Sequence, residues 1–431
     1  MSILRSLNTG VAGLRSHGEA LGVVADNIAN VNTVGFKTSR AIFQDVLGRS
    51  AGGSKQLPMA GAGSRMSYVE QLFHQGALLT TDSPTDLAVS GGGFFAVRGN
   101  VGGIDGQFYT RAGQFHMDTT GRLVNPDGLA LQGYAADPTG QLGSTISDLV
   151  VDSGTLQPFA STAADIAANL DSNEVVPAAW DALNPDGTSN FSTAMTVYDS
   201  LGNSHEITVY FRKSAANAWE WHAMVDGGEL TGGTPGVPTE GAAGTLTFTT
   251  DGALDTEAAG ASSWDFIGAT AGQAIAFDFG TSITTDGGLG TDGTTQYASP
   301  SSTTALAQDG YGAGQVQGIA IGQDGTVTGV YSNGQQRTIG QVVLAEFAND
   351  VGLERLGQGL WRESQDSGAA LIGAAGSGAR GAVVQGALEQ SNVDLGQQFV
   401  DLIAYQRGFQ ANSKTIQTAD EMYGEIVNLR R

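Results

Sequence analysis

The sequence predicts a mainly β protein with a terminal α-helical coiled coil, in which two antiparallel β domains of sandwich or barrel type are inserted between paired N- and C-terminal helices. Two observations predict this architecture. Apolar residues recur every seven positions near both chain ends, whereas the middle of the chain consists of short apolar runs separated by turn dipeptides. A seven-residue step is typical of coiled-coil helices, and short runs bounded by turns are typical of antiparallel sheets.

The first 30 residues predict a helix, since residues 2–30 contain no proline and carry a regular apolar column. This N-terminal column consists of Leu7, Leu14, Leu21 and Ile28. The last 40 or so residues predict a second helix, with Ser391 or Asn392 as its N-cap and Asp394 in its first turn. The C-terminal column consists of Leu395, Leu402, Phe409, Ile416 and Tyr423.

Neither helix can bury its column alone, so we predict that the two helices pair and bring the chain ends together. Small residues would allow the close approach that this pairing needs: Gly10, Gly13, Gly18, Gly408 and Ala411. Periodicity alone also permits an ordinary amphipathic helix on a globular core. The position of both columns at the chain ends, with the same step, favours pairing.

Between about residues 76 and 375 the pattern is β. Asp-Gly and Asn-Gly pairs such as 127–128, 324–325 and 333–334 recur between apolar runs, and these pairs favour hairpin turns. The alanine-rich stretch Ala163–Asn169 is the exception and predicts a short helix. Residues 48–65 are rich in Gly, Ser and Ala and predict an extended linker.

These observations predict a definite domain organisation. The predicted parts are a terminal coiled-coil domain of residues 1–30 plus 388–431, an extended linker at 31–75, an inner β domain of 76–150 plus 308–375, an outer β domain at 151–307 and a Gly-rich joint at 376–387.

Composition argues against several classes of function. The 431 residues include no cysteine, so the chain has neither a disulfide framework nor a thiolate site. A formal net charge of −23 disfavours nucleic acid and anionic lipid as partners. No run reaches the roughly 18 apolar residues of a membrane span. Charged residues interrupt the first thirty positions, so we expect neither membrane insertion nor a cleaved signal peptide.

Residue patterns that carry chemistry are missing or weak. The five histidines are scattered without metal-ligand spacing, and we expect no catalytic residue, no cofactor and no metal site. Gly376–Gly381 fits the dinucleotide pattern G-x-G-x-x-G, but repeated βαβ units are absent, and we interpret it as a flexible joint. Trp219 and Trp221, two apart on a predicted strand, are either core residues or a binding strip.

One segment carries a specific family resemblance. Residues 26–37 (DNIANVNTVGFK) resemble the signature of the bacterial flagellar axial proteins, the rod and hook family. The matching residues are Asn27, Asn30, Thr33, Gly35, Phe36 and Lys37, and the asparagines and Gly35 would end the first helix. Further stretches in the family's order are similar: residues 85–95, 109–115, 386–395 and 405–412. The central stretch 195–205 is similar to the outer domain of the hook members.

This resemblance implies a non-enzymatic structural subunit of the flagellar hook, which leaves the cell by flagellar type III export. It implies polymerisation into a curved hollow tube outside the cell, a flexible joint that transmits torque from rod to filament. Implied partners are further copies of the chain, the distal rod and hook–filament junction proteins, and, during assembly, the hook cap and the export apparatus.

We expect the N- and C-terminal columns to be the assembly residues and the segments at about 31–75 and 373–387 to be flexible linkers. A distal rod protein of the same family is the alternative within the family. A secreted β-rich adhesin and an NAD-dependent enzyme using residues 376–381 are alternatives from other classes.

Overall fold

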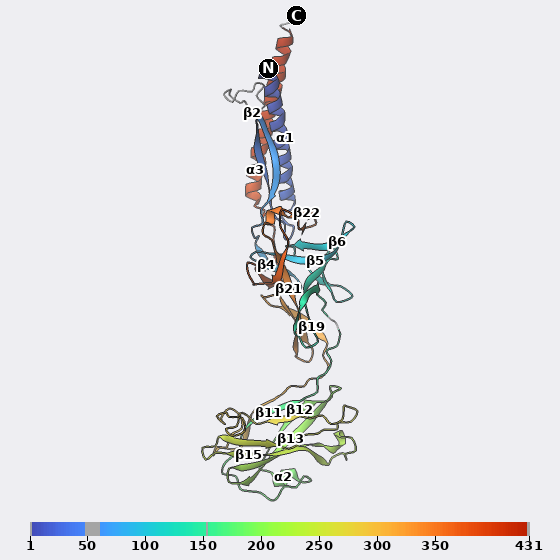
Figure 1. Ribbon diagram of the computed structural model, residues 1–431, viewed down its shortest axis with the longest axis vertical. Coiled ribbons are helices and arrows are strands. Elements are labelled where there is room, and N and C mark those ends of the chain that lie inside the picture. Colours follow the sequence, from blue (N-terminus) through green and yellow to red (C-terminus); the bar gives the residue numbers. More distant parts are fainter. Residues whose placement is uncertain (1, 48–60, 152–153, 429–431) are drawn as a thin grey trace. The chain divides into compact units, whose positions relative to one another are not determined.

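The computed structural model describes residues 2–47, 61–151 and 154–428. The chain folds as two compact units, one of residues 1–153, 318–330 and 336–431 and the other of residues 154–317 and 331–335. The predicted fold class is confirmed, because helices lie at the two chain ends and antiparallel sheets form most of the rest (Figure 1).

Two long helices, α1 (Ser2–Ala29) and α3 (Leu395–Asn428), lie side by side in the first unit (Figure 1). They run antiparallel: Gly10 faces Ile416, Gly13 faces Asn412 and Gly18 faces Phe409. The N-cap of α3 differs from the prediction. Asp394 Oδ1 accepts hydrogen bonds from the backbone N–H groups of Gly396 (2.8 Å) and Gln397 (3.2 Å), because Asn392 is engaged elsewhere.

The extended linker predicted at 31–75 is wrong in its described part, which contains a β-hairpin. Strand β1 (Ser39–Leu47) pairs antiparallel with β2 (Gly61–Gln71), and residues 48–60 lie outside the described residues. The hairpin packs along α1, where Ser64 Oγ lies 3.2 Å from Ser16 Oγ. A ladder of paired backbone groups beside a helix is more stable than an extended chain.

The remainder of the first unit is a β structure around one apolar core. Its main sheet has the strand order β19-β20-β21-β9-β5-β6-β23-β22. These strands are β5 (Phe94–Val101), β6 (Ile104–Thr110), β9 (Ala130–Ala136), β19 (Val316–Ile321), β20 (Thr326–Tyr331), β21 (Gln336–Glu346), β22 (Glu354–Gly357) and β23 (Leu360–Arg362). Strands β7 (His116–Met117), β8 (Leu123–Val124), β10 (Leu142–Asp148) and β24 (Leu371–Ala374) join it. Fully buried Phe95, Val97, Val342 and Leu344 form part of the core.

The Gly-rich joint predicted at 376–387 is also more ordered than expected. Strand β25 (Ala382–Gln385) pairs with β4 (Leu87–Ser90), and β26 (Ala387–Glu389) pairs with β3 (Leu78–Thr80). The preceding loop is held by Arg380, whose Nε donates to the Ala374 carbonyl (3.1 Å). Because a strand follows Gly376–Gly381 where a dinucleotide site needs a helix, the NAD alternative has no structural support here.

The second unit is a β structure with a tryptophan-rich core. Its main sheet has the order β12-β13-β14-β15-β16, and β11 lies between β17 and β18 in another. These strands are β11 (Ala163–Asn169), β12 (Phe191–Tyr198), β13 (Ser204–Ala215), β14 (Ala218–Asp226), β15 (Pro238–Phe248), β16 (Leu254–Ala259), β17 (Ala276–Asp278) and β18 (Ser302–Gln308), with the short helices α2 (Pro185–Thr188) and η1 (Gly227–Glu229). A further short helix, η2 (Asp350–Gly352), belongs to the first unit.

This core tests two predictions made from the sequence, one for residues 163–169 and one for the two tryptophans of β14. The helix predicted at Ala163–Asn169 is wrong, since the segment is strand β11 with alternating buried Ala164, Ile166 and Ala168. Alternate burial in a sheet outweighs the helix propensity of alanine. Trp219 and Trp221 are both buried, so they are core residues and form no exposed binding strip.

None of the helices in the described part of the chain is long and apolar enough to span a membrane.

Replacing Phe211, which is fully buried in the second unit, with alanine is expected to destabilise that unit by about 3–5 kcal/mol through loss of buried area and formation of a cavity. Urea unfolding of the full chain, followed by tryptophan fluorescence, measures this because Trp180, Trp219, Trp221 and Trp264 all lie in that unit. Leu289→Ala, at a site 81% exposed, is the control and should change stability by under about 0.5 kcal/mol. Equal effects would contradict the assigned core.

Candidate functional site

The family motif at residues 26–37 lies where α1 ends and the chain enters the hairpin. Asn27 is buried and connects three elements: its Nδ2 donates to the Ser39 carbonyl (2.7 Å) and to Gln398 Oε1 of α3 (2.9 Å). Its Oδ1 accepts from the Ser39 backbone N–H (2.9 Å). This one amide therefore sets the relative positions of α1, β1 and α3.

The next motif residues end the helix. Asn30 Nδ2 donates to the Asp26 carbonyl (2.9 Å), and Thr33 Oγ1 donates to Asn30 Oδ1 (3.0 Å). The Asn30 backbone N–H donates to the same Asp26 carbonyl (3.1 Å), so side chain and backbone together close the last turn of α1. Both side chains take part in local contacts at the surface, so the motif combines a turn with a buried connection.

Gly35 and Phe36 fit tightly against the β structure. Gly35 has a φ of +68°, and a Cβ there would lie 2.6 Å from the backbone of Arg111 and Ala112. Its N–H donates to the Glu389 carbonyl (2.7 Å). The buried ring of Phe36 has the Arg355 guanidinium 5.3 Å from its centre. Only glycine can occupy position 35, because it needs both a positive φ and the absence of a Cβ.

A buried triad of charges lies beneath this turn. The side chains of Lys37 and Glu389 are 0% exposed and that of Arg111 is 4% exposed. Lys37 Nζ donates to Glu389 Oε1 (2.6 Å), and Arg111 Nη1 donates to Glu389 Oε2 (3.2 Å). The Gly76 N–H also donates to this carboxylate (2.8 Å). The triad therefore joins the N-terminal motif, the inner β structure and the strand that leads to α3.

The electrostatics of the triad follow from its burial. Burial lowers the pKa of Lys37, and the neighbouring Glu389 carboxylate acts in the opposite direction. Lys37 Nζ also donates to the His74 carbonyl (2.9 Å), and Arg111 Nη2 donates to the Gly91 carbonyl (2.9 Å). The two cations thus have hydrogen-bond acceptors, as buried charges require.

Asn392 completes what we call the buried junction, which comprises residues 35–39, residues 72–76, Arg111 and residues 389–392. Asn392 Oδ1 accepts from the Thr38 N–H (2.7 Å), and its Nδ2 donates to the carbonyls of Leu72 (2.8 Å) and His74 (2.9 Å). No sequence pattern assigned a role to Arg111, Glu389, Asn392 or Gln398. Three of them lie in segments that resemble the family, and a charged residue such as Glu389 within an apolar strand was the available signal.

The predicted assembly columns are only partly buried within one chain. Leu7, Leu14, Leu21 and Ile28 are half-buried on α1, and Leu402, Phe409 and Ile416 are half-buried on α3, whereas Leu395 and Tyr423 are exposed. The buried face of α1 instead carries mostly small residues: Gly10, Gly13, Ser16, Ala20, Val24 and Asn27. A Cβ on Gly13 would lie 2.5 Å from Asn412, so glycine is what lets the helices approach closely.

Helix α3 keeps several large apolar side chains in contact with solvent: Leu395, Phe399, Val400, Ile403, Met422 and Tyr423. Three of them, Phe399, Val400 and Ile403, lie within roughly 100° around the helix axis and are 51%, 60% and 48% exposed, and we call these three the outer α3 face. Singly exposed apolar residues are ordinary, whereas neighbouring ones on one side of a helix are typical of an interaction surface. The arrangement of the helix pair is therefore suited to association with other helices.

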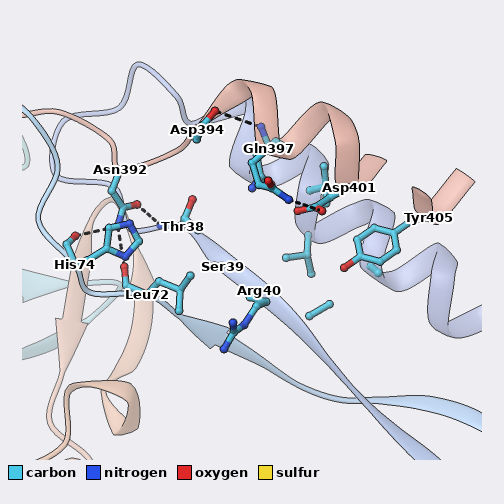
Figure 2. A pocket seen from close by; sticks show the side chains of 15 residues that line it. Thr38, Ser39, Arg40, Leu72, His74, Asn392, Asp394, Gln397, Asp401 and Tyr405 are labelled. Carbon is cyan, nitrogen blue, oxygen red and sulfur yellow. Dashed lines mark hydrogen bonds between the residues drawn. The ribbon is translucent and has the colours of Figure 1, made fainter. Parts of the chain in front are cut away.

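A cavity of about 330 Å³ opens between α1, β1 and α3. Figure 2 shows Gln397, Asp401 and Tyr405 on α3, with Asp394 just before the helix, and Ser39 and Arg40 on β1, with Thr38 just before the strand. Ala20, Val24, Ala41 and Leu72 add an apolar lining. Burial and the charge of Asp401 raise the pKa of Tyr405. Among the described residues, no cluster of His, Cys, Asp and Glu has the arrangement of a metal site.

Comparison with known families gives four matches in chain order. They are a flagellar basal body rod protein model at residues 7–37, a flagellar hook protein D1 domain model at 88–166, a flagellar basal body protein D2 domain model at 169–311, and a flagellar basal body rod C-terminal model at 384–429. The matches include both helices and parts of both β units.

Individual relatives are similar over nearly the whole chain. The flagellar hook protein FlgE of Borreliella burgdorferi is 36% identical, covering 99% of this chain and 100% of the relative. The FlgE of Salmonella typhimurium is 35% identical with the same coverage. Among solved structures, Helicobacter pylori FlgE2 has a TM-score of 0.52 at 16% identity, covering 72% of this chain and 100% of that chain, which supports the fold.

Replacing Glu389 with glutamine leaves Lys37 and Arg111 buried without a counter-charge, and is expected to destabilise the first unit by about 3–5 kcal/mol. Urea unfolding monitored by hydrogen exchange at residues 35–39 and 72–76 measures the loss. Glu70→Gln is the matched control, since Glu70 pairs with Arg40, whose side chain is 58% exposed, and such pairs contribute at most about 1 kcal/mol. Similar costs for both variants would contradict the role given to the triad.

Proposed function

Because the chain belongs to the flagellar hook protein family and is a structural subunit of the flagellar hook, we propose that its paired terminal helices drive self-association into a curved hollow tube. This tube is the flexible joint that transmits torque from rod to filament. The observation that carries the proposal is the outer α3 face, on which three neighbouring apolar side chains remain between 48% and 60% exposed.

The half-buried columns support the same proposal. Burial of apolar area contributes roughly 25 cal/mol per Å², and the columns of α1 and α3 keep part of that area in water within one chain. Neighbouring helices would remove it. In this proposal, the terminal helices form one part of the subunit and the inner and outer β domains form two others.

The proposal also includes the partner proteins of the tube and its location. A flagellar axial polymer needs neighbours at both ends, so the distal rod and the hook–filament junction proteins are the proposed partners, with the hook cap and the export apparatus during assembly. The tube lies outside the cell. The subunit acts mechanically and has no catalytic role, in keeping with the structural family to which it belongs.

The source of bending differs from the one expected from the sequence. The segments 31–75 and 373–387 were expected to be flexible linkers, but their described residues are largely paired in strands β1, β2, β25 and β26. Rigid connection through the buried junction would transmit torque from the helices to the inner β structure. Bending compliance would then come from contacts between subunits.

The double substitution Leu14→Asp with Phe409→Asp is expected to abolish polymers, because both side chains lie on the paired columns and Phe409 packs beside Gly18. Electron microscopy and sedimentation of the full chain measure polymer, and tryptophan fluorescence shows that the β units stay folded. The conservative pair Leu14→Met with Phe409→Leu should still polymerise. Normal tubes from the aspartate pair would refute the role of the columns.

A second substitution separates contacts within a chain from contacts between chains. Phe399→Asp with Ile403→Asp changes two residues of the outer α3 face, which are 51% and 48% exposed. We expect helix content by circular dichroism to stay near that of the unsubstituted monomer while polymer yield falls at least tenfold. Phe399→Leu with Ile403→Val is the control. Full polymer yield from the aspartate pair would show that this face is not an interface.

A further inference from the structure

Charged residues on α3 follow the same seven-residue step as the apolar columns. Asp394 and Asp401 are seven apart, and so are Arg407 and Lys414. Within the described residues, none of the four belongs to an ion pair; the pairs formed by the helices are Arg15 with Glu19 and Arg355 with Asp26. Two acidic and two basic positions of equal spacing therefore lack a partner of opposite charge among the described residues. The carboxylates do have neutral donors: Asp394 Oδ1 caps α3, and Asp401 Oδ1 accepts from Gln397 Nε2 (3.0 Å).

The acidic pair borders the cavity between α1, β1 and α3. Asp394 and Asp401 both line it, and Figure 2 shows Asp394 at the start of α3 and Asp401 further along the helix. The other charged residue of the lining, Arg40, is paired with Glu70 (2.6 Å), and His74 also lines it. With apolar Ala20, Val24 and Leu72 in the same lining, the cavity suits a side chain that has an aliphatic stem and a cationic end.

The basic pair lies on another side of the same helix. At 3.6 residues per turn, positions thirteen apart differ by roughly 220° around the axis, so Arg407 lies nearly opposite Asp394 and Lys414 nearly opposite Asp401. Arg407 and Lys414 are exposed, and Lys414 borders the groove between α3 and Ser6 of α1. The exposed Val400 and Ile403 of the outer α3 face belong to the same half of the helix.

We propose that the basic pair of one chain docks at the acidic cavity of a second copy, with Arg407 against Asp394 and Lys414 against Asp401 of the neighbour. The inference rests on the proposed function, since it names the contact by which the polymer sets its register. The two helices would be parallel and displaced by thirteen residues, roughly 20 Å at 1.5 Å per residue.

The geometry also decides between a polymer and a closed dimer. An antiparallel arrangement would satisfy both charge pairs as well, but each copy would then use both faces on one partner and close a dimer. A parallel displaced contact joins different faces, so every copy keeps one free acidic cavity and one free basic pair. Such a heterologous contact propagates without closing, as a helical polymer requires.

Cross-linking tests the contact directly because the chain has no cysteine. Chains carrying Asp401→Cys are mixed with equal amounts of chains carrying Lys414→Cys, polymerised and oxidised. The proposal expects covalent dimers from this mixture and none from Asp401→Cys alone. Within one helix the two positions lie roughly 20 Å apart, beyond the reach of a disulfide. A mixture of Asp394→Cys and Lys414→Cys chains is the control, since it would cross-link only in the antiparallel arrangement.

Charge exchange provides the second readout. Asp401→Lys and Lys414→Asp should each reduce polymer yield at least tenfold, and the chain carrying both should recover most of it. Asp420→Lys, an exposed site on α3 outside both pairs, controls for net charge and should polymerise normally.

The outcomes separate the two proposals. Polymers without the cross-link, or single charge variants that assemble normally, would overturn this contact and leave the proposed function standing. No polymer from the unsubstituted chain under any condition would overturn both.

Discussion

The buried carboxylate of Glu389 is the group on which the first unit depends. It receives hydrogen bonds from Lys37 after α1, from Arg111 of the inner β structure and from the Gly76 backbone after the hairpin. These residues are far apart in sequence, and each would be costly to bury without this partner. The charge triad contributes less as net stabilisation than as a constraint, because other arrangements of the same segments would leave at least one charge unpaired.

In the two helices that extend from this junction, small and large side chains occupy different places. Glycine and other small residues lie in the contact between α1 and α3, whereas many of the larger apolar side chains are half-buried or exposed. Each interior glycine lowers helix stability by about 1 kcal/mol. A helix pair built in this way is closely packed yet incompletely buried, and its remaining apolar area is available to neighbouring chains.

The glycine-rich segments of the first unit are more ordered than their composition predicts. Segments rich in glycine were expected to be loose, yet β25, β26 and the described part of the hairpin are paired in ladders. Glycine there serves close approach, as at Gly35 against Arg111 and Ala112. A subunit that carries torque gains from such connections, because a hydrogen-bonded ladder resists displacement better than an extended chain.

The sequence by itself determined the two terminal helices, the β character of the middle and the family, because seven-residue periodicity, turn dipeptides and the motif at residues 26–37 are local patterns. It did not reveal β11, where burial on alternate positions overrode alanine's helix propensity, or the hairpin β1–β2, whose stability depends on packing against α1. Lys37 was identified as a motif residue, but its partner Glu389 lies 352 positions away. Only the tertiary structure could bring the two together, because burial and charge pairing act between residues that are close in space, and no local pattern encodes that distance.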